Sequence, residues 1–145
     1  MQQAGKIFVS KFKEIRPHWS QPGGLGTQMA TNTLIGGPPP YLHWDRDRGI
    51  VCNSCAAGTF LLPRDCVQVL HRHPVDEVYV LVRGRATFRS DEGPEIEAEL
   101  FDCMYAPAGV YHAARNIGLE DAWIIWFWVG LCRPEDFEIY PDASK

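Results

Sequence analysis

The feature that most constrains this chain is a run of metal-binding residue types spaced as they would be on neighbouring β-strands. The run has the pattern H-x-H-x3-E-x6-G, and its fixed residues are His71, His73, Glu77 and Gly84. Residues two apart on a strand point to the same face, so both imidazoles share one face. A turn at residues 74–76 lets Glu77 enter the next strand, and Gly84 suits the tight turn that ends it. The spacing therefore predicts a hairpin that brings two imidazoles and one carboxylate together.

A second run supplies one more imidazole from further along the chain. Its pattern is P-x-G-x2-H-x3-N, and its fixed residues are Pro107, Gly109, His112 and Asn116. Pro and Gly favour a turn ahead of His112, and Asn suits the turn that ends the strand. A buried histidine on its own is more often a hydrogen-bonded core residue than a ligand. Here, however, eight positions fit two patterns that agree with strand geometry, and this predicts that one metal ion is surrounded by three imidazoles and a carboxylate.

From about residue 50 onward, the chain alternates in the way expected of antiparallel strands. Val67 and Val69 have the same parity as the two histidines of the first run, so all four are predicted to lie on one face. Apolar and polar residues also alternate in the segments 85–89 and 95–100, and turn residues separate the segments. Many short strands at this spacing are typical of an all-β sandwich or barrel.

Two segments break this alternation because they are apolar on both faces. They are residues 77–82 and 123–129. A strand of this kind needs cover on both sides. In a small barrel the second cover has to come from the N-terminal residues or from another subunit, and we therefore expect a homodimer. The tryptophan content fits this expectation, since aromatic residues are enriched at interfaces.

The chain divides into two regions of different composition. Residues 1–49 are rich in Gly, Pro and polar residues, which interrupt regular structure. They predict an N-terminal arm with short extended segments that packs on the barrel or on a partner subunit. Residues 50–145 carry the strand pattern and predict the barrel with its C-terminal tail. Within the tail, residues 133–140 predict one short helix, because Pro134 stands early and acidic residues follow it.

Size, charge and cysteine content argue against several classes of protein. The chain has 145 residues, of which 46% are hydrophobic, as expected of one globular domain. Its net charge of −4 and the lack of a long Lys/Arg stretch argue against a nucleic-acid partner. No apolar segment has the length of a signal peptide or a membrane span, so we expect a cytoplasmic protein without a membrane partner. The five cysteines, including Cys52 and Cys55, are then expected to be ordinary reduced thiols.

Through these two runs, the chain resembles the cupin superfamily, and in particular a small single-domain member. The runs are similar to the two signature motifs of that family, and the resemblance covers residues 50–131. Two positions depart from the family pattern, because Asp65 and Phe101 stand where the motifs often open with Gly. Both are loop positions that bind no metal, so they affect the turn shapes and not the ligand set. The resemblance implies an antiparallel β-barrel of the jelly-roll or double-stranded β-helix type.

The resemblance also implies which residues bind the metal. They are His71, His73, Glu77 and His112. The expected cofactor is one divalent transition-metal ion. Imidazole and carboxylate ligands suit Fe, Mn, Co, Ni, Cu and Zn about equally well, so the sequence leaves the metal open.

Aromatic residues near the runs are candidates for catalysis and for the substrate pocket. Tyr79 shares parity with Glu77 and is expected to face the interior, where it serves as a proton donor or simply fills the core. Tyr105 is a second candidate catalytic residue, and Glu77 is counted with both as a catalytic carboxylate. The predicted substrate pocket is lined by Tyr111, Trp123, Trp126 and Trp128. Because their strand is apolar on both faces, the sequence leaves open which tryptophans face inward.

These features predict a metal-dependent enzyme whose substrate is a small oxygenated organic molecule bound to the metal. Non-redox chemistry of the lyase, isomerase, dehydratase or cyclase type is the favoured interpretation. One alternative is an Fe(II)-dependent dioxygenase with the same ligands. Another is a non-enzymatic cupin that only binds a small molecule, since fold alone does not choose among these functions.

Overall fold

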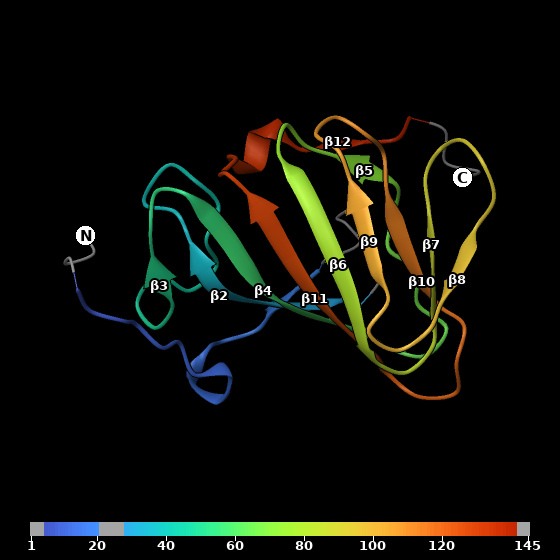
Figure 1. Ribbon diagram of the computed structural model, residues 1–145, viewed down its shortest axis with the longest axis horizontal. Coiled ribbons are helices and arrows are strands. Elements are labelled where there is room, and N and C mark those ends of the chain that lie inside the picture. Colours follow the sequence, from blue (N-terminus) through green and yellow to red (C-terminus); the bar gives the residue numbers. More distant parts are fainter. Residues whose placement is uncertain (1–4, 21–27, 142–145) are drawn as a thin grey trace.

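The computed structural model describes residues 5–20 and 28–141, so parts of the predicted arm and the end of the tail lie outside the described residues. The described chain consists mainly of β-strands (Figure 1), which confirms the predicted all-β class. Its largest layer is a seven-stranded sheet. In spatial order, its strands are β1 (His18–Trp19), β2 (Ala30–Gly36), β4 (Cys55–Leu62), β11 (Ala122–Val129), β6 (Asp76–Arg83) and β9 (Cys103–Ala106), with β3 (Ile50–Val51) parallel to β2.

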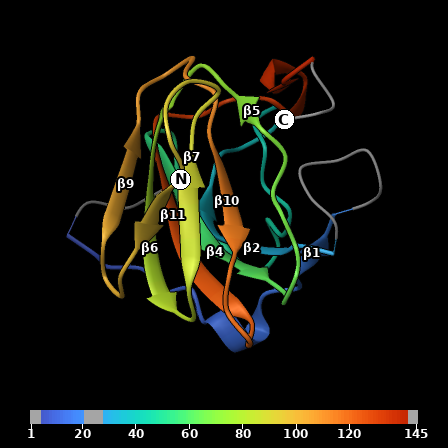
Figure 2. The ribbon, with the colours of Figure 1, turned by 90° about the vertical axis from the view of Figure 1, so that its right-hand side faces the viewer.

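A smaller sheet faces the large one across the interior (Figure 2). Its strands, in spatial order, are β10 (Ala113–Asn116), β7 (Ala86–Arg89) and β8 (Ile96–Ala98). A third pair joins β12 (Glu138–Ile139) to β5 (His71–Arg72). The helical elements of the described ranges are two 3-10 turns, η1 (Phe12–Glu14) and η2 (Pro134–Asp136). None of the helices in these ranges is long and apolar enough to cross a membrane.

The two larger sheets do not join into a closed barrel. Among the described residues, no ladder of strand pairs connects them. The open side lies at β8 and β9, which have only three and four residues and are each paired along one edge. The architecture is therefore a jelly-roll-like arrangement of two facing, mostly antiparallel sheets, which confirms the predicted all-β class, although the barrel is not closed.

The core lies between the sheets and follows the period-two pattern of the long strands. Alternate residues of β4, β6 and β11 are buried. Phe60, Tyr79 and Ile124, one from each of these strands, belong to the same buried cluster. Full burial of an apolar side chain of this size stabilises the fold by about 1.5–3 kcal/mol. The predicted inward direction of Tyr79 is confirmed, since its relative exposure is 1%.

The alternation of buried and exposed residues shifts by one position just before His71. The sequence predicts Val67 and Val69 on the histidine face, but Gln68 and Leu70 are the buried residues there. Residues 67–70 are not part of a continuous strand, because β5 begins at His71 and only an isolated bridge forms at Val67. Without a continuous strand, period-two counting does not carry across these residues, and that prediction was wrong.

The C-terminal segment is extended rather than helical. Residues 133–140 form the short turn η2 and then β12, which pairs with β5 so that Ile139 lies opposite His71. Of the predicted C-terminal helix, only the three-residue 3-10 helix η2 is present, with Pro134 at its start. The turn ends at Phe137, whose backbone is already extended, because the following residues bond to β5 instead of to their own helix. This pairing carries the tail across the first histidine run.

Two turns keep a left-handed backbone at residues that carry a Cβ. Asp65 and Phe101 have φ angles of 65° and 69°. They occupy the positions where the cupin motifs often have Gly, so the turn shape is retained at a cost of about 1–2 kcal/mol per residue. Gly84 is different, because a Cβ there would lie 2.8 Å from the carbonyl oxygen of Asp121. The glycine of the first run is thus required by a close backbone approach.

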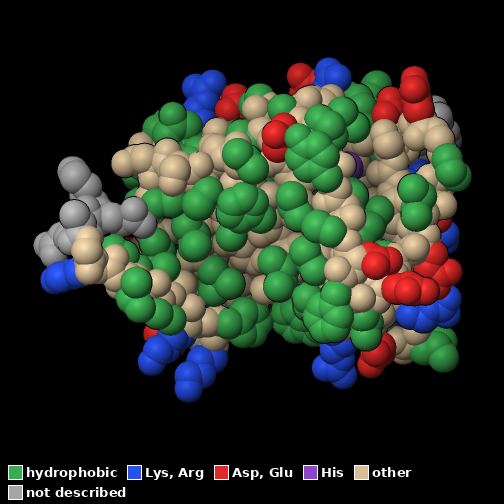
Figure 3. Space-filling view, in the orientation of Figure 1, with side chains coloured by type: hydrophobic (Ala, Val, Ile, Leu, Met, Phe, Trp, Pro, Cys, Tyr) green, Lys and Arg blue, Asp and Glu red, His purple; other side chains and the backbone are tan. Residues whose placement is uncertain are grey.

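The outer face of the large sheet is apolar across neighbouring strands (Figure 3). The strand register places Tyr105 beside Val78, and Val78 beside Phe127. Phe12 of the N-terminal segment packs against Trp123 of this face, with ring centres 5.6 Å apart. Phe127 is 38% exposed. The homodimer stays a prediction, and the apolar outer face of the large sheet is the surface that it would bury.

Candidate metal centre

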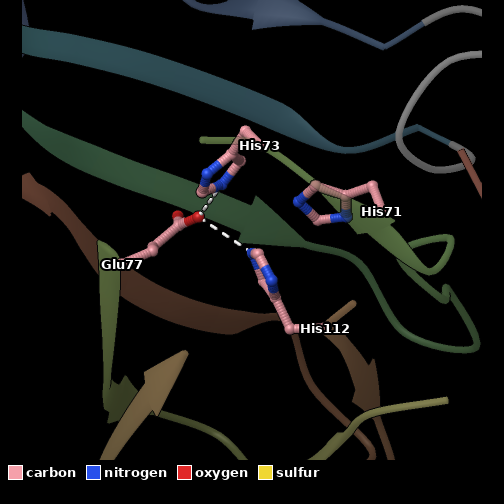
Figure 4. Close-up of side chains that lie close together, drawn as sticks. All are labelled: His71, His73, Glu77 and His112. Atoms are coloured by element: carbon pink, nitrogen blue, oxygen red, sulfur yellow. Dashed lines mark hydrogen bonds and ion pairs between the residues drawn. The ribbon is translucent and has the colours of Figure 1, made fainter. Parts of the chain in front are cut away.

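Four side chains from separate segments converge inside the molecule (Figure 4). His71 lies in β5, His73 directly follows that strand, Glu77 lies in β6, and His112 immediately precedes β10. All four are buried, and one ligand atom from each lies within 4.8 Å of the others. The structure therefore brings together the four predicted metal ligands, which we call the ligand cluster.

Backbone hydrogen bonds hold the two sequence runs against each other. The amide of His71 donates to the carbonyl of His112 at 3.2 Å, and the amide of His112 donates back to His71 at 2.9 Å. The amide of Gly109 donates to the carbonyl of His73 at 2.9 Å. The Pro-Gly turn of the second run is thus attached to the first run, which fixes the three imidazoles relative to one another.

Each imidazole is oriented by a backbone carbonyl two residues away in the sequence. The Nδ1–O distances are 2.9 Å for His71 to Val69, 3.0 Å for His73 to Val75, and 2.8 Å for His112 to Val110. With the proton on Nδ1, a neutral ring presents the lone pair of Nε2 to the centre of the cluster. Fixing the second nitrogen in this way is how proteins orient histidines that bind metals.

Glu77 provides the negative charge of the ligand cluster. Its Oε2 lies 2.5 Å from Nε2 of His73 and 2.9 Å from Nε2 of His112. Burial alone would raise the pKa of Glu77, but the hydrogen bonds with His112 and His73 outweigh burial and lower the pKa to about 2. Burial also lowers the pKa of His71 to about 3, helped by the neighbouring His112. The cluster thus combines an ionised carboxylate with at least one neutral imidazole.

The donor set of the ligand cluster fits a transition-metal ion. A neutral ring whose Nδ1–H is already bonded offers only a lone pair at Nε2, and an ionised carboxylate offers only acceptor oxygens. In the hydrogen bonds to Glu77 a proton lies between Nε2 and the carboxylate, and a bound metal ion would take the place of that proton. Three imidazole nitrogens and one carboxylate oxygen are ligand types shared by Fe, Mn, Co, Ni, Cu and Zn. The residues therefore fit one divalent ion without selecting its identity.

A small cavity of about 30 Å³ adjoins the ligand cluster and reaches His71 and Glu77. Trp126 and Trp128 line it from β11, and Phe60 lines it from β4. Trp123 has the opposite parity and packs outside against Phe12. The structure thus answers the question that the sequence left open, since Trp126 and Trp128 are the inward tryptophans of this strand.

Tyr79 lines the same cavity and is held by one well-placed partner. Its hydroxyl donates to Oε1 of Gln68 at 3.2 Å, and the amide of Ala114 donates to the same oxygen at 3.1 Å. Burial, with the nearby charge of Glu77, raises the pKa of Tyr79 well above its usual value. Tyr79 is therefore a neutral phenol whose single proton is held by the hydrogen bond to Gln68. Gln68 was missed by sequence reasoning because of the parity shift ahead of β5.

Three further residues line the cavity from the N-terminal and C-terminal segments of the chain, and we call them the cover. They are Met29, Trp44 and Phe137. The ring of Phe137 lies 5.1 Å from that of His73 and 5.6 Å from that of Trp128, and it stacks parallel to His71 at 6.1 Å. The cover was also missed, because its residues come from the arm and the tail, where the sequence has no usable periodicity.

Tyr105 and Tyr111 lie away from this cavity. Tyr105 is 59% exposed on the outer face, and its hydroxyl donates to Oδ2 of Asp76 at 2.9 Å. The ring of Tyr111 stands over the guanidinium of Arg72 at 4.6 Å. Both tyrosines line a second cavity, of about 230 Å³, that lies at the open side of the sandwich and reaches the other side of His112. The structure therefore groups Tyr79, Trp126 and Trp128 with the metal ligands, and places Tyr105, Tyr111 and Trp123 elsewhere.

Comparison with known proteins identifies relatives of this fold. Residues 59–128 match the sequence model of the cupin domain. No curated protein sequence matches the chain. Among solved structures, the chain is similar to a cupin 2 conserved barrel domain protein from Rhodopseudomonas palustris, with a TM-score of 0.60 and 15% identity over 90% of this chain and 78% of that one.

Two similar structures carry the names of enzymes. One is the DMSP lyase DddQ from Ruegeria pomeroyi DSS-3, with a TM-score of 0.64 and 21% identity over 81% of this chain and 57% of that one. The other is the polyketide cyclase RemF from Streptomyces resistomycificus, with a TM-score of 0.66 and 14% identity over 89% of this chain and 82% of that one. The chain spans about three fifths of the length of the lyase structures that it matches. At these identities the likeness concerns the fold.

Proposed function

The chain belongs to the cupin family, and we propose that it is a metal-dependent enzyme that acts on a small oxygenated organic molecule by non-redox chemistry. The reaction would be of the lyase, isomerase, dehydratase or cyclase type. The observation that carries the proposal is the ligand cluster of three histidines and one glutamate beside a small aromatic cavity. A metal-binding donor set next to such a cavity suits the binding of an oxygen-bearing group in a site from which bulk water is excluded.

The ligand cluster would hold the ion, and the other residues have distinct tasks. A bound divalent metal supplies Lewis acidity toward a carbonyl, carboxylate or water oxygen. Tyr79 holds a proton at its phenolic oxygen, and Gln68 orients that hydroxyl. Phe60, Trp126 and Trp128 exclude water, and the low dielectric of an aromatic wall strengthens each polar contact with the substrate. Tyr79 is therefore the proposed proton donor, with Gln68 as its positioning residue.

The size of the cavity restricts what can reach the ligand cluster. A volume of about 30 Å³ is room for about one water molecule. A larger substrate that enters this cavity would have to displace part of the cover. Phe137 is the natural candidate, because it sits on a tail that is attached through the two-residue strand β12. We propose that substrate entry moves Phe137 and leaves the four ligands in place.

The lyase and the cyclase support the proposal only at the level of fold. Both names describe non-redox reactions carried by similar folds, and neither identifies the substrate of this chain. The alternative of an Fe(II) dioxygenase uses the same ligand types and remains the main competing function. Substrate-dependent consumption of dioxygen by iron-loaded protein would select the dioxygenase.

Elemental analysis of protein purified without a metal-binding tag tests the proposal. We expect about one transition-metal ion per chain in the parent, and strong loss of that metal in His71→Ala and His112→Ala. His18→Ala is the matched control, because His18 lies in β1 and stacks on Trp44 outside the ligand cluster. No metal in the parent protein, even after reconstitution with each candidate ion, would refute the central claim.

A further inference from the structure

The turn between β3 and β4 carries a pair of thiols that the proposed function does not use. Cys52 follows β3 and Cys55 begins β4. Their sulfur atoms lie 4.0 Å apart, and the thiol of Cys52 donates to the carbonyl oxygen of Cys55 at 3.2 Å. In strand order, β3 and β4 lie on the other side of β11 from β6 and β9 (Figure 1), and neither cysteine lines the cavity beside the ligand cluster.

The local backbone holds both cysteines in place. The amide of Cys52 donates to the carbonyl of Gly36 in β2 at 2.9 Å. Cys55 is paired in register with Val129 of β11. A disulfide bond has an S–S distance of about 2.05 Å, so the two sulfurs have to approach by about 2 Å, which side-chain rotation on a short turn can supply. The anchored turn therefore keeps the second thiol at high effective concentration next to the first.

The two thiols differ in access and in acidity. Cys52 is buried at 7% exposure, whereas Cys55 is partly exposed. Burial acts to raise the pKa of Cys52, but hydrogen bonds with the backbone at Ser54 and Cys55 outweigh it and lower the pKa. Burial and the negative charge of an ionised Cys52 raise the pKa of Cys55. An external reagent therefore reaches the sulfur of Cys55, whereas the buried thiol of Cys52 ionises more readily.

We propose that Cys52 and Cys55 are a dithiol modification site that forms a reversible internal disulfide by exchange with a small-molecule disulfide. Cys55, the accessible thiol, loses its proton and attacks one sulfur of the reagent, which releases one reagent thiolate and leaves a mixed disulfide on Cys55. The thiolate of Cys52 then attacks the sulfur of Cys55 and releases the second reagent thiolate. The protein loses two protons and two electrons, and the reagent disulfide is reduced to two thiols.

The other cysteines offer controls within the same molecule. Cys103 is exposed on β9, while Cys66 and Cys132 are buried. Burial raises the pKa of Cys132 to about 12, which keeps that thiol protonated and unreactive. Cys103 is therefore expected to react with the same reagent and to remain a mixed disulfide.

The experiment treats the full-length protein with oxidised glutathione and maps its cysteines by peptide mass spectrometry. We expect the parent to lose two free thiols as an internal Cys52–Cys55 disulfide that dithiothreitol reverses, with glutathione retained on Cys103. Cys52→Ser should keep glutathione on Cys55, because the attacking sulfur is missing. Cys55→Ser should leave Cys52 as a free thiol, because Cys52 is buried.

Two results would overturn the inference. One is a parent protein in which Cys52 and Cys55 both stay free while Cys103 is modified. The other is stable glutathione on Cys55 of the parent, which would mean that Cys52 does not reach it. The cysteine mapping of the parent protein alone tests the proposal, so a variant that folds poorly does not affect the conclusion. The outcome is independent of the metal, and we expect the same disulfide in protein treated with a chelator.

Discussion

The ligand cluster and the cover both border one small cavity, but the fold holds them in different ways. The cluster comes from segments in strand register. Glu77 is paired with Ala106 of β9 and with Trp128 of β11, and His71 and His112 exchange backbone hydrogen bonds. The cover comes from a loop and from the tail that follows η2. One side is thus fixed by cooperative backbone pairing, and the other by a few local contacts.

This difference predicts that the two sides respond differently to perturbation. Phe137 is held near the cluster by β12, which has two residues, and by the ion pair between Arg72 and Glu138, whose side chains are 40% and 57% exposed. Exposed ion pairs contribute little, typically about 0.2–1 kcal/mol. Segments with few contacts open locally at a fraction of the global unfolding free energy. We therefore expect a stable metal site beneath a cover that opens.

The largest effect is expected from removing the metal. An ion that binds only the folded chain at a thousand-fold excess over its Kd stabilises it by about 4 kcal/mol. For a chain of this size, that corresponds to a fall in Tm of about 10 °C when a chelator removes the ion. Thermal unfolding followed by circular dichroism, with and without chelator, measures the effect.

The matched variants separate metal binding from general destabilisation. His112→Ala should unfold at the same temperature with and without chelator, because it lacks one of the four ligands. His18→Ala should keep the response of the parent. A parent Tm that neither the chelator nor added divalent metal changes would contradict the comparison, because the cluster would then be an ordinary buried polar network.

The next largest effect is expected from Phe137→Ala. The substitution removes a partly buried ring that touches His73 and Trp128, and it should lower the free energy of unfolding by about 2 kcal/mol. Metal content should stay at the parent level, because all four ligands remain. Benzoate should then bind the metal-loaded variant at least ten-fold more tightly than the parent, as the cover no longer excludes a planar ring. Isothermal titration calorimetry measures this change.

Phe137→Leu is the control for this variant, since it keeps an apolar side chain of similar reach. It should retain most of the stability and most of the exclusion of benzoate. Equal affinity of the parent and Phe137→Ala for benzoate would show that Phe137 does not limit entry. Loss of metal from Phe137→Ala would show instead that the cover and the cluster are not separable.

The ligand cluster was predictable because strand parity and spacing carry direct geometric information. Two histidines at i and i+2 share a face in any strand. Tyr79 was predictable for the same reason. The predicted hairpin was wrong, because β5 pairs with β12 while β6 pairs with β9 and β11, so Glu77 reaches the cluster from the large sheet. Asp65 and Phe101 show the limit of motif matching, because their left-handed turns form without the glycine that such turns favour.

The cover was not predictable, because its position depends on tertiary contacts of irregular segments. Phe137 reaches the cavity only because β12 pairs with β5, and a pairing of two residues leaves no periodic signal in the sequence. Trp44 follows His43, which is buried and bonds to the backbone of Ile50 rather than lying in a solvated loop.

A smaller effect is expected from the ion pair that anchors Trp44. Asp45 is buried and accepts hydrogen bonds from the backbone amide of Arg16 at 2.8 Å and from its guanidinium at 2.6 Å. Asp45→Asn should lower the free energy of unfolding by about 1–2 kcal/mol at neutral pH, since it weakens a charge-assisted contact. Chemical denaturation at several pH values measures the difference between parent and variant.

The stability difference between the parent and Asp45→Asn should change with pH in one direction. The hydrogen bond with the Arg16 side chain, acting against burial, lowers the pKa of Asp45 from 3.8 to about 2. A lowered pKa means that the contribution of this pair is complete above pH 3.8 and is lost as the pH falls toward 2. The difference between parent and Asp45→Asn should therefore shrink over that interval. A difference that stays constant down to pH 2 would show that the charge of Asp45 is not what anchors this part of the cover.

The smallest effect is expected on the cluster side, at the turn between β8 and β9. Phe101 has φ of 69° and is 74% exposed, and its amide donates to the carbonyl of Leu81 at 2.7 Å. Phe101→Gly removes about 1 kcal/mol of strain from the left-handed backbone. The greater entropy of the unfolded chain with glycine offsets about half of this, so we expect the free energy of unfolding to rise by about 0.5 kcal/mol. Leu100→Gly, at an adjacent exposed residue without positive φ, should instead destabilise by about 0.5–1 kcal/mol. Urea denaturation of both variants measures the contrast, and equal destabilisation would mean that this turn is held by the side chain of Phe101 and not by backbone register.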